Sequence, residues 1–127
     1  MLGDRDAIAT IAVRDLEVAR RFYEGTLGLK PQTDGQPQPG VLALASGSST
    51  VLVYESRYAG TNKATAINWM VGDDLERIAR ALKAAGVQFE HYDFPGSTLE
   101  GDVHVMRDMK VAWFRDPDGN ILSLVSG

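Results

Sequence analysis

The sequence predicts an α+β fold made of two similar halves, each with the order strand–helix–strand–strand–strand. The first observation behind this prediction is a weak internal repeat, in which residues 65–87 follow the pattern of residues 7–29 and Val13 aligns with Val71. The second is that each copy changes from a short apolar stretch to a helical pattern. The third is the length of 127 residues, which suits one domain with a real core.

Each predicted helix has a start signal and a stop signal. Asp15 and Asp74 precede the two helical patterns and can accept hydrogen bonds from the free N–H groups of a first turn. Apolar residues then recur every three or four positions, over residues 16–27 and again over residues 75–85. Gly28 and Gly86 follow, where a left-handed residue would end each helix.

Hairpins are predicted after each helix. Residues 40–45 and 50–54 flank a Ser-Gly-Ser-Ser turn, and residues 110–115 and 120–125 flank Asp116-Pro117-Asp118-Gly119. Asp116 and Asp118 are therefore interpreted as turn formers and not as a catalytic carboxylate pair. We expect one domain over residues 1–127, with a first module over about 7–56, a linker over about 57–64 and a second module over about 65–126. Residues 93–109 are the least predictable stretch: they are long for a loop, and residues 102–106 alternate as a strand would.

Composition excludes several classes of function. The chain has no cysteine and two histidines, which excludes disulfide scaffolds, thiolate metal sites and cysteine nucleophiles. A net charge of -4 argues against a general nucleic-acid binder. No apolar run is long enough to span a membrane, and the polar start is not typical of a signal peptide. We expect a cytoplasmic protein with neither a nucleic-acid nor a membrane partner.

The order of these motifs resembles the vicinal oxygen chelate superfamily, the group of glyoxalases, bleomycin-resistance proteins and extradiol dioxygenases. The resemblance covers about residues 7–125 and is carried by Val13-Arg14-Asp15-Leu16, Phe22-Tyr23, Leu27-Gly28-Leu29, Asp74-Leu75, Leu82-Lys83-Ala84-Ala85-Gly86-Val87 and Phe114-Arg115-Asp116-Pro117-Asp118-Gly119-Asn120. It implies two tandem βαβββ modules with curved mixed sheets, outer helices and a concave ligand cavity. It also implies a homodimer.

Metal-dependent members of the family hold a divalent ion with His or Gln on the first strand, His on the strand that begins the second half, and Glu on the last strand. Carried over by position, these ligands fall on Ile8, Ala66 and Ser123. None is a good metal ligand, so we expect no metal and no other cofactor.

Strand alternation predicts which side chains line the cavity, because residues two apart share a face. The expected ligand-binding residues are Ile8, Thr10, Ala66, Asn68, Met70, Ile121, Ser123 and Trp113. Ala12 and Val125 share these faces, while the face of Trp113 itself is ambiguous. Their composition suits a small organic molecule, and the alternative is a core that fills a collapsed cavity.

Catalytic residues are left open. His104 is a candidate base and Tyr54 could present its hydroxyl to the cavity, against the alternatives of an edge histidine and a structural tyrosine. His91 could pair with Asp93 as base and orienting group, or lie at a solvated edge. A displaced metal site at Glu100, Asp102 and His104 is conceivable. Met106, Arg107 and Met109 could form a mobile lid, with Arg107 pairing with an anionic ligand.

These observations favour a metal-independent protein of the bleomycin-resistance type, which binds or sequesters a small organic compound in an apolar cleft. The alternative function is an enzyme of lyase, isomerase or dioxygenase type with a divergent or relocated active site. A third interpretation is a structural or interaction domain whose cavity is filled.

Overall fold

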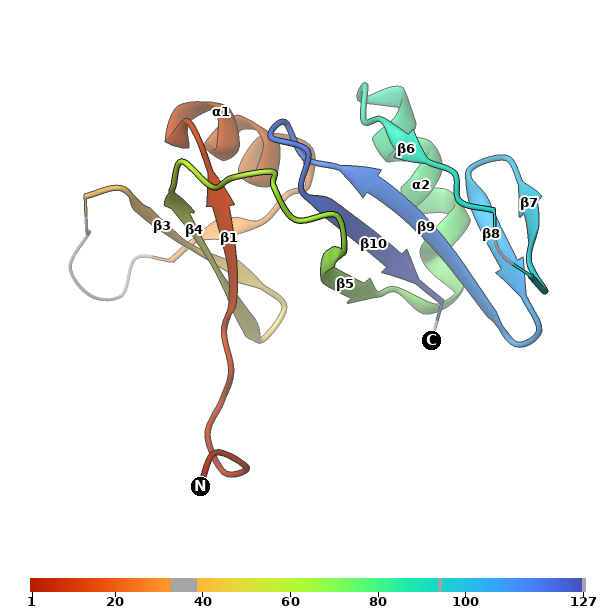
Figure 1. Cartoon of the computed structure of the whole chain (residues 1–127), viewed down its shortest axis with the longest axis horizontal. Helices are drawn as coiled ribbons and strands as arrows, with labels where there is room; N and C mark the ends of the chain where they lie inside the picture. The colour runs from red at the N-terminus through yellow and green to blue at the C-terminus, as the bar shows by residue number, and fades with distance from the viewer. Residues whose placement is uncertain (33–38, 94, 127) are drawn as a thin grey trace. The chain divides into compact units, whose positions relative to one another are not determined.

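The computed structural model describes residues 1–32, 39–93 and 95–126 and resolves the chain into two compact units, Met1–Ala59 and Gly60–Gly127. Figure 1 shows that each unit carries a mixed sheet and a helix of its own. The predicted α+β class with two βαβββ-like halves is confirmed. Among the described residues, no helix is long and apolar enough to cross a membrane.

The first unit contains a four-stranded sheet. Its elements are β1 (Ala9–Val13), α1 (Leu16–Arg20), the π-helical turn η1 (Arg21–Thr26), β2 (Lys30–Pro31), β3 (Val41–Ser46) and β4 (Ser49–Glu55). The strand order is β1-β4-β3-β2, with β1 parallel to β4 and the other pairs antiparallel. The predicted Ser-Gly-Ser-Ser turn joins β3 to β4, and the Ser49 hydroxyl donates to the Ser46 carbonyl across it.

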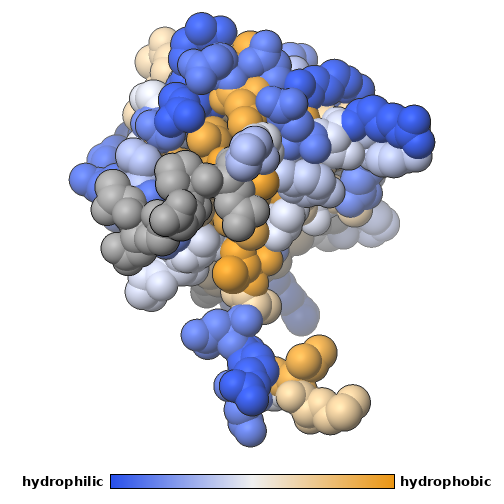
Figure 2. All heavy atoms as spheres, turned by 90° about the vertical axis from the view of Figure 1, so that its left-hand side faces the viewer, coloured by the Kyte–Doolittle hydropathy of each residue, from blue (hydrophilic) through white to orange (hydrophobic). Residues whose placement is uncertain are grey.

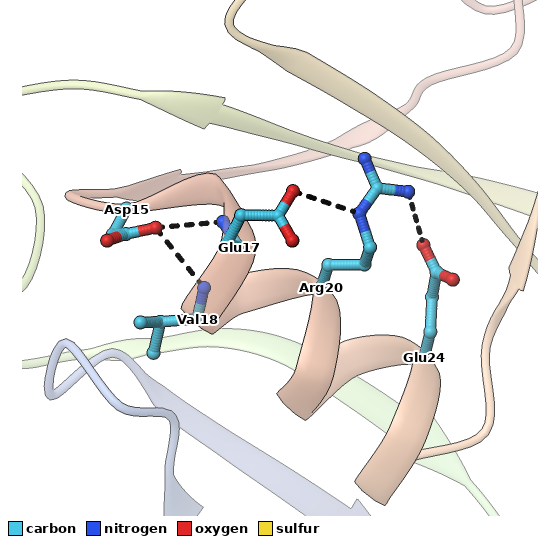
Figure 3. A network of polar contacts seen from close by, with 5 residues as sticks. All are labelled: Asp15, Glu17, Val18, Arg20 and Glu24. Carbon is cyan, nitrogen blue, oxygen red and sulfur yellow. Dashed lines mark hydrogen bonds and ion pairs between the residues drawn. The ribbon is translucent and has the colours of Figure 1, made fainter.

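The predicted cap of the first helix is present. Figure 3 shows the Asp15 carboxylate accepting from the backbone N–H groups of Glu17 and Val18, at 2.8 and 3.3 Å. One turn further on, the Arg20 guanidinium lies between Glu17 and Glu24, at N···O distances of 3.6 and 3.4 Å. The helical stretch then widens into η1 and ends before Gly28, whose φ of 79° is the predicted left-handed conformation.

Alternation along the strands builds the core of this unit. Ile11, Val13, Leu44, Val51 and Val53 are buried between the sheet and the helical segment, which contributes Ala19 and Tyr23. The short β2 pairs with β3 at Ala45 and Leu44, and the Gln32 N–H donates to the Ala43 carbonyl at 2.9 Å. The other end of β3 leaves Val41, Leu42 and Ala43 half-buried. Figure 2 shows a band of hydrophobic residues, bordered by hydrophilic ones, on one side of the molecule.

The second unit contains a six-stranded sheet packed on α2. Its elements are β5 (Thr65–Met70), the 3₁₀ turn η2 (Gly72–Asp74), α2 (Leu75–Ala84), β6 (Phe89–Glu90), β7 (Thr98–Glu100), β8 (Val103–Met106), β9 (Met109–Arg115) and β10 (Ile121–Val125). The order is β5-β10-β9-β8-β7, with β6 also paired to β9. β5 runs parallel to β10, and the other pairs are antiparallel.

Two predictions for this unit are wrong. Asp74 makes no side-chain cap, because η2 places it in helical backbone, and its carboxylate pairs instead with Arg77 at 3.4 Å. The stretch over residues 93–109 contains the hairpin β7–β8, although Phe94 lies outside the described residues. Met106 pairs with Met109 across a tight turn that holds Arg107, so these residues belong to a sheet hairpin and not to a lid.

The β9–β10 turn forms as predicted. Asp116 is 4% exposed, and its carboxylate accepts from the backbone N–H groups of Asp118 and Asn120 at 2.9 and 2.8 Å. The other carboxylate oxygen accepts from the Asn120 side-chain amide at 2.7 Å. Gly119 completes the turn with a φ of 90°. The interpretation of Asp116 as a turn former is confirmed.

Candidate functional site

The second sheet has one face against α2 and one face opposite it. Phe114, Leu122 and Leu124 are buried on the α2 face. On the opposite face, strand register places Asn68 beside Ser123, and Ser123 beside Trp113. We call these three side chains the polar row. It joins a residue of β5 to two residues of the β9–β10 hairpin, which lies far from β5 in the sequence.

A hydrogen bond joins the first two members of the polar row. The buried Ser123 hydroxyl donates to Oδ1 of the exposed Asn68. Because that oxygen already accepts, the amide N–H groups of Asn68 are the part of the pair that can donate to another molecule. Ser123 is therefore a positioning group for the Asn68 amide.

A register shift in β5 decides how Trp113 is held. Ile121 pairs with Thr65 while Leu122 pairs with Ile67, so Ala66 is the extra residue of a bulge. The bulge turns Thr65 to the same face of the sheet as Asn68. Uniform alternation along the strand had predicted Ala66 on that face. The Trp113 indole N–H donates to the Thr65 hydroxyl at 3.0 Å, which orients the ring.

Aromatic side chains surround Trp113. Its ring meets that of His104 at 4.8 Å and that of Tyr92 at 5.2 Å between centroids, both edge-to-face. Burial, followed by the nearby Glu90 carboxylate, raises the pKa of the Tyr92 phenol. Trp113, whose face the sequence left ambiguous, is thus at the centre of an aromatic cluster on the face opposite α2.

His104 belongs to this cluster and is 1% exposed, so the interpretation as an edge histidine is wrong. Its Nε2 accepts the backbone N–H of Tyr92 at 2.9 Å. An imidazole nitrogen that accepts a hydrogen bond is unprotonated, so this contact defines the tautomer of the ring. Through this hydrogen bond His104 holds the segment after β6 against the sheet. The lone pair of its Nε2 already accepts the Tyr92 N–H.

His91 has a carboxylate partner, but not the one expected. Its Nε2 lies 2.7 Å from Asp102, in place of the predicted pairing with Asp93. Lys83 of α2 approaches the other oxygen of Asp102 at 3.0 Å. The hydrogen bond with His91, followed by that from Lys83, lowers the pKa of Asp102 against the opposing effect of burial.

An ion pair lies at the other side of the cluster. The Arg115 Nε group is 2.7 Å from a Glu90 carboxylate oxygen, and cross-strand register puts Glu90 next to Trp113. Sequence reasoning missed Thr65, Tyr92, Glu90 and Arg115. The predicted turn at residues 116–119 could have placed Arg115 and Trp113, because a hairpin turn determines which residues pair across it.

The remaining predicted site residues divide between the units. In the second unit, Met70 is 67% exposed and Ile121 is buried beside Arg115. In the first unit, Tyr54 is 39% exposed and pairs across the strands with Ala12 and Val41. Thr10 is exposed on β1. Ile8 is 51% exposed and precedes β1, on the N-terminal segment that extends away from the sheet in Figure 1.

The three family metal positions do not fit a metal ion. Ile8 and Ala66 carry no donor atom, and the Ser123 hydroxyl is bonded to Asn68. Across residues 1–32, 39–93 and 95–126, no group of three His, Cys, Asp or Glu side chains could hold a metal ion.

Solved structures share the fold of this chain. Fosfomycin resistance protein FosX from Mesorhizobium loti has a TM-score of 0.69 and 18% identity, over 100% of this chain and 94% of that chain. TnmS3, an antibiotic binding protein from Streptomyces sp. CB03234, has a TM-score of 0.61 and 22% identity, over 98% and 96%. A glyoxalase/bleomycin resistance protein/dioxygenase from Alicyclobacillus acidocaldarius has a TM-score of 0.67 and 20% identity, over 98% and 93%. At these identities the likeness establishes the fold alone.

Sequence comparison gives the family. A search of curated proteins found no significant match. The sequence profile described as Glyoxalase/Bleomycin resistance protein/Dioxygenase superfamily matches residues 6–124, which is nearly the whole chain. The chain therefore belongs to the glyoxalase/bleomycin resistance protein/dioxygenase superfamily.

Proposed function

We propose that this protein binds a small organic molecule on the face of the second sheet opposite α2, without a metal ion. The observation that carries the proposal is the placement of Trp113. The Thr65 hydroxyl orients its ring, and the polar row continues from it to the Asn68 amide. A flat apolar surface beside a directed N–H donor is the usual composition of a small-ligand site.

The chemistry of this face suggests the kind of ligand. The edge of a planar ring would pack against Trp113 and Tyr92, which are already arranged edge-to-face. A carbonyl or hydroxyl oxygen of the same ligand would accept from the Asn68 amide. A planar, oxygen-bearing organic compound therefore matches the site better than a phosphate or another highly charged anion.

Metal independence rests on the donor atoms. The family positions hold an isoleucine, an alanine and a hydroxyl that is already hydrogen-bonded. Elemental analysis of purified protein tests this part directly. A stoichiometric transition metal that survives dialysis would overturn it.

Two relatives in fold give the first compounds to test. One is described as an antibiotic binding protein and another as a fosfomycin resistance protein. A screen of aromatic antibiotics and related planar metabolites by thermal shift should find compounds that raise Tm in a concentration-dependent way. Calorimetry then gives the Kd of each compound found.

Variants locate the site. Trp113→Ala and Asn68→Ala should each weaken binding about tenfold or more, as truncation of a central contact does. Trp69→Phe is the matched control, because Trp69 stacks on Phe114 at 6.3 Å on the α2 face. Unchanged affinity in the first two variants, with circular dichroism like that of the parent protein, would place the ligand elsewhere.

Binding is favoured over catalysis by the contacts of His104. Its Nε2 accepts a backbone N–H and its side chain is almost completely buried, which does not suit a general base. If an activity is found with a ligand from the screen, His104→Asn should leave turnover unchanged. Loss of turnover with binding retained would restore His104 as a base.

A homodimer is part of the proposal. Apolar side chains such as Met70 and Leu99 are well exposed, and the hydrophobic band in Figure 2 is a surface that association would cover. Light scattering across a concentration series should give twice the chain mass. A constant monomer mass at high concentration would contradict this. A cytoplasmic location stays a prediction, to be tested by cell fractionation.

A further inference from the structure

A hollow lies in the second unit, between the start of α2 and the turn that joins β8 to β9. Its volume is about 350 Å³ and its lining residues are Gly72, Asp73, Glu76, Val105, Met106, Arg107, Asp108, Met109, Lys110 and Ser126. This volume lies within the range of small-ligand pockets. None of the lining residues belongs to the polar row or to the aromatic cluster around Trp113, so this hollow is independent of the proposed function.

The framework of the hollow is held by specific bonds. The Lys110 ammonium is 2.7 Å from a Glu76 carboxylate oxygen, which ties β9 to α2. The Lys110 backbone N–H donates to the Ser126 hydroxyl at 2.9 Å, and the Ser126 N–H donates back to the Lys110 carbonyl at 2.9 Å. These bonds therefore connect β9 to α2 and to the residue that follows β10, around the hollow.

The charges that remain are unequal. The Glu76–Lys110 pair is internally neutral, and each partner shifts the pKa of the other in the expected direction, with Glu76 lowered and Lys110 raised. The lining as a whole has a net charge of -1, which comes from Asp73, Asp108 and Arg107. Within the described ranges, neither aspartate forms an ion pair, while Arg107 is exposed in the hairpin turn.

The other part of the lining is apolar. Val105, Met106 and Met109 contribute aliphatic and thioether surface, and methionine adapts to ligands of irregular shape. A carboxylate-bearing rim around such a surface is complementary to a molecule with an ammonium group on a short hydrocarbon chain. The volume of the hollow and the side chains of Val105, Met106 and Met109, in addition to the carboxylates, are what make it a site.

We propose that this hollow binds a small aliphatic amine, whose ammonium group lies between Asp73 and Asp108 and whose chain packs on Met106 and Met109. The positive charge of Arg107 repels the ammonium group of the ligand and so limits the affinity. An anionic ligand at Arg107, as the sequence suggested, is disfavoured by the two aspartates.

The test uses the full chain and 1,4-diaminobutane, with amide chemical shifts followed by NMR. Saturable shifts should appear at Asp73, Val105 and Asp108 and not at Trp113. Asp73→Asn together with Asp108→Asn should weaken binding about five- to tenfold, since exposed charge pairs contribute modestly. Asp4→Asn together with Asp93→Asn is the matched control, because it removes the same two charges from exposed positions outside the hollow.

Arg107→Ala should change the affinity for the diamine in the opposite direction to the aspartate substitutions. Removing this cation should strengthen binding of the diamine about twofold or more, whereas it would weaken binding of an anion. Butanedioate serves as the anionic probe. Binding of butanedioate in place of the diamine, shifts located elsewhere, or equal affinity in the Asp73/Asp108 variant and the Asp4/Asp93 control would each overturn the proposal.

Discussion

Replacing Asp116 with alanine should destabilise the second unit more than any other single change at a carboxylate considered above. The Asp116 side chain is nearly inaccessible and accepts from two backbone N–H groups and from the Asn120 amide, at 2.7 to 2.9 Å. These bonds shape the turn that sets the pairing of β9 with β10. The pairing in turn places Trp113 beside Ser123. A stability measurement at Asp116 is therefore also a test of how the polar row is assembled.

The magnitude follows from the donors that would lose their partner. A hydrogen bond to a charged group contributes about 1.5–3 kcal/mol, and such contributions are not additive within one network. Asn120 is itself buried, so water replaces the carboxylate poorly. We expect Asp116→Ala to lower the free energy of unfolding by about 3 kcal/mol and Tm by about 10 °C. Asp116→Asn keeps an oxygen for the backbone donors and should cost about 1 kcal/mol.

The assay is equilibrium unfolding in urea, followed by tryptophan fluorescence and circular dichroism. Asp93→Ala, at an exposed position, is the control and should change the free energy of unfolding by less than about 0.5 kcal/mol. If Asp116→Ala were as stable as the parent protein, or if the asparagine variant were destabilised as much as the alanine variant, the argument from the buried network would be refuted.

Three further predictions concern local structure. The hydrogen bond with His91 lowers the pKa of Asp102 in the folded state. The Asp102 carboxylate therefore stabilises the folded protein at pH values above the unfolded pKa of about 4. This stabilisation is lost as the pH falls through the lower, folded pKa. The difference in unfolding free energy between the parent and Asp102→Asn should therefore shrink from about pH 7 to about pH 3, and a constant difference would contradict the assignment. Gly28→Ala should lower the free energy of unfolding by about 1 kcal/mol, because residue 28 has a left-handed backbone conformation. Gly25→Ala should leave the free energy of unfolding unchanged or raise it, because Gly25 lies in the helical segment and no atom lies within 4 Å of the added carbon. Asp15→Ala should cost about 1 kcal/mol in thermal unfolding, and no loss would show that the cap is dispensable.

Local sequence signals predicted much of the fold. Asp15 and Gly28 bound the first helical segment as expected, because a cap and a left-handed glycine depend on a few neighbouring residues. The Asp116–Gly119 turn was predicted for the same reason. Asp74 shows the limit of such signals, since a 3₁₀ turn ahead of α2 changed its backbone and removed the cap. Alternation over residues 102–106 left a strand open there, but the hairpin β7–β8 itself was not predicted, because its stability comes from pairing with β9.

The candidate site was predicted less completely. Asn68 and Ser123 were expected on one face, and the structure places them side by side. Whether the ligand-binding prediction for them is right awaits the binding experiments. Ala66 was placed by uniform alternation, and the bulge at that residue breaks the alternation and brings Thr65 to Trp113 instead. His104 looked like an edge residue because its partners come from Tyr92 and Trp113, both far from it along the chain.

Local patterns, their order along the chain and the internal repeat were thus sufficient for the family, the two-halved α+β architecture, the cap at Asp15 and the turns. The family resemblance, carried over by position, places Ile8, Ala66 and Ser123 where the usual metal ligands would be, and the absence of a metal stays a prediction. Packing between distant segments was needed to bury His104, to pair His91 with Asp102 and to orient Trp113. The physical reason is range: a helix cap or a tight turn is satisfied by neighbouring backbone groups, whereas strand register and burial depend on contacts that form only when the sheet assembles.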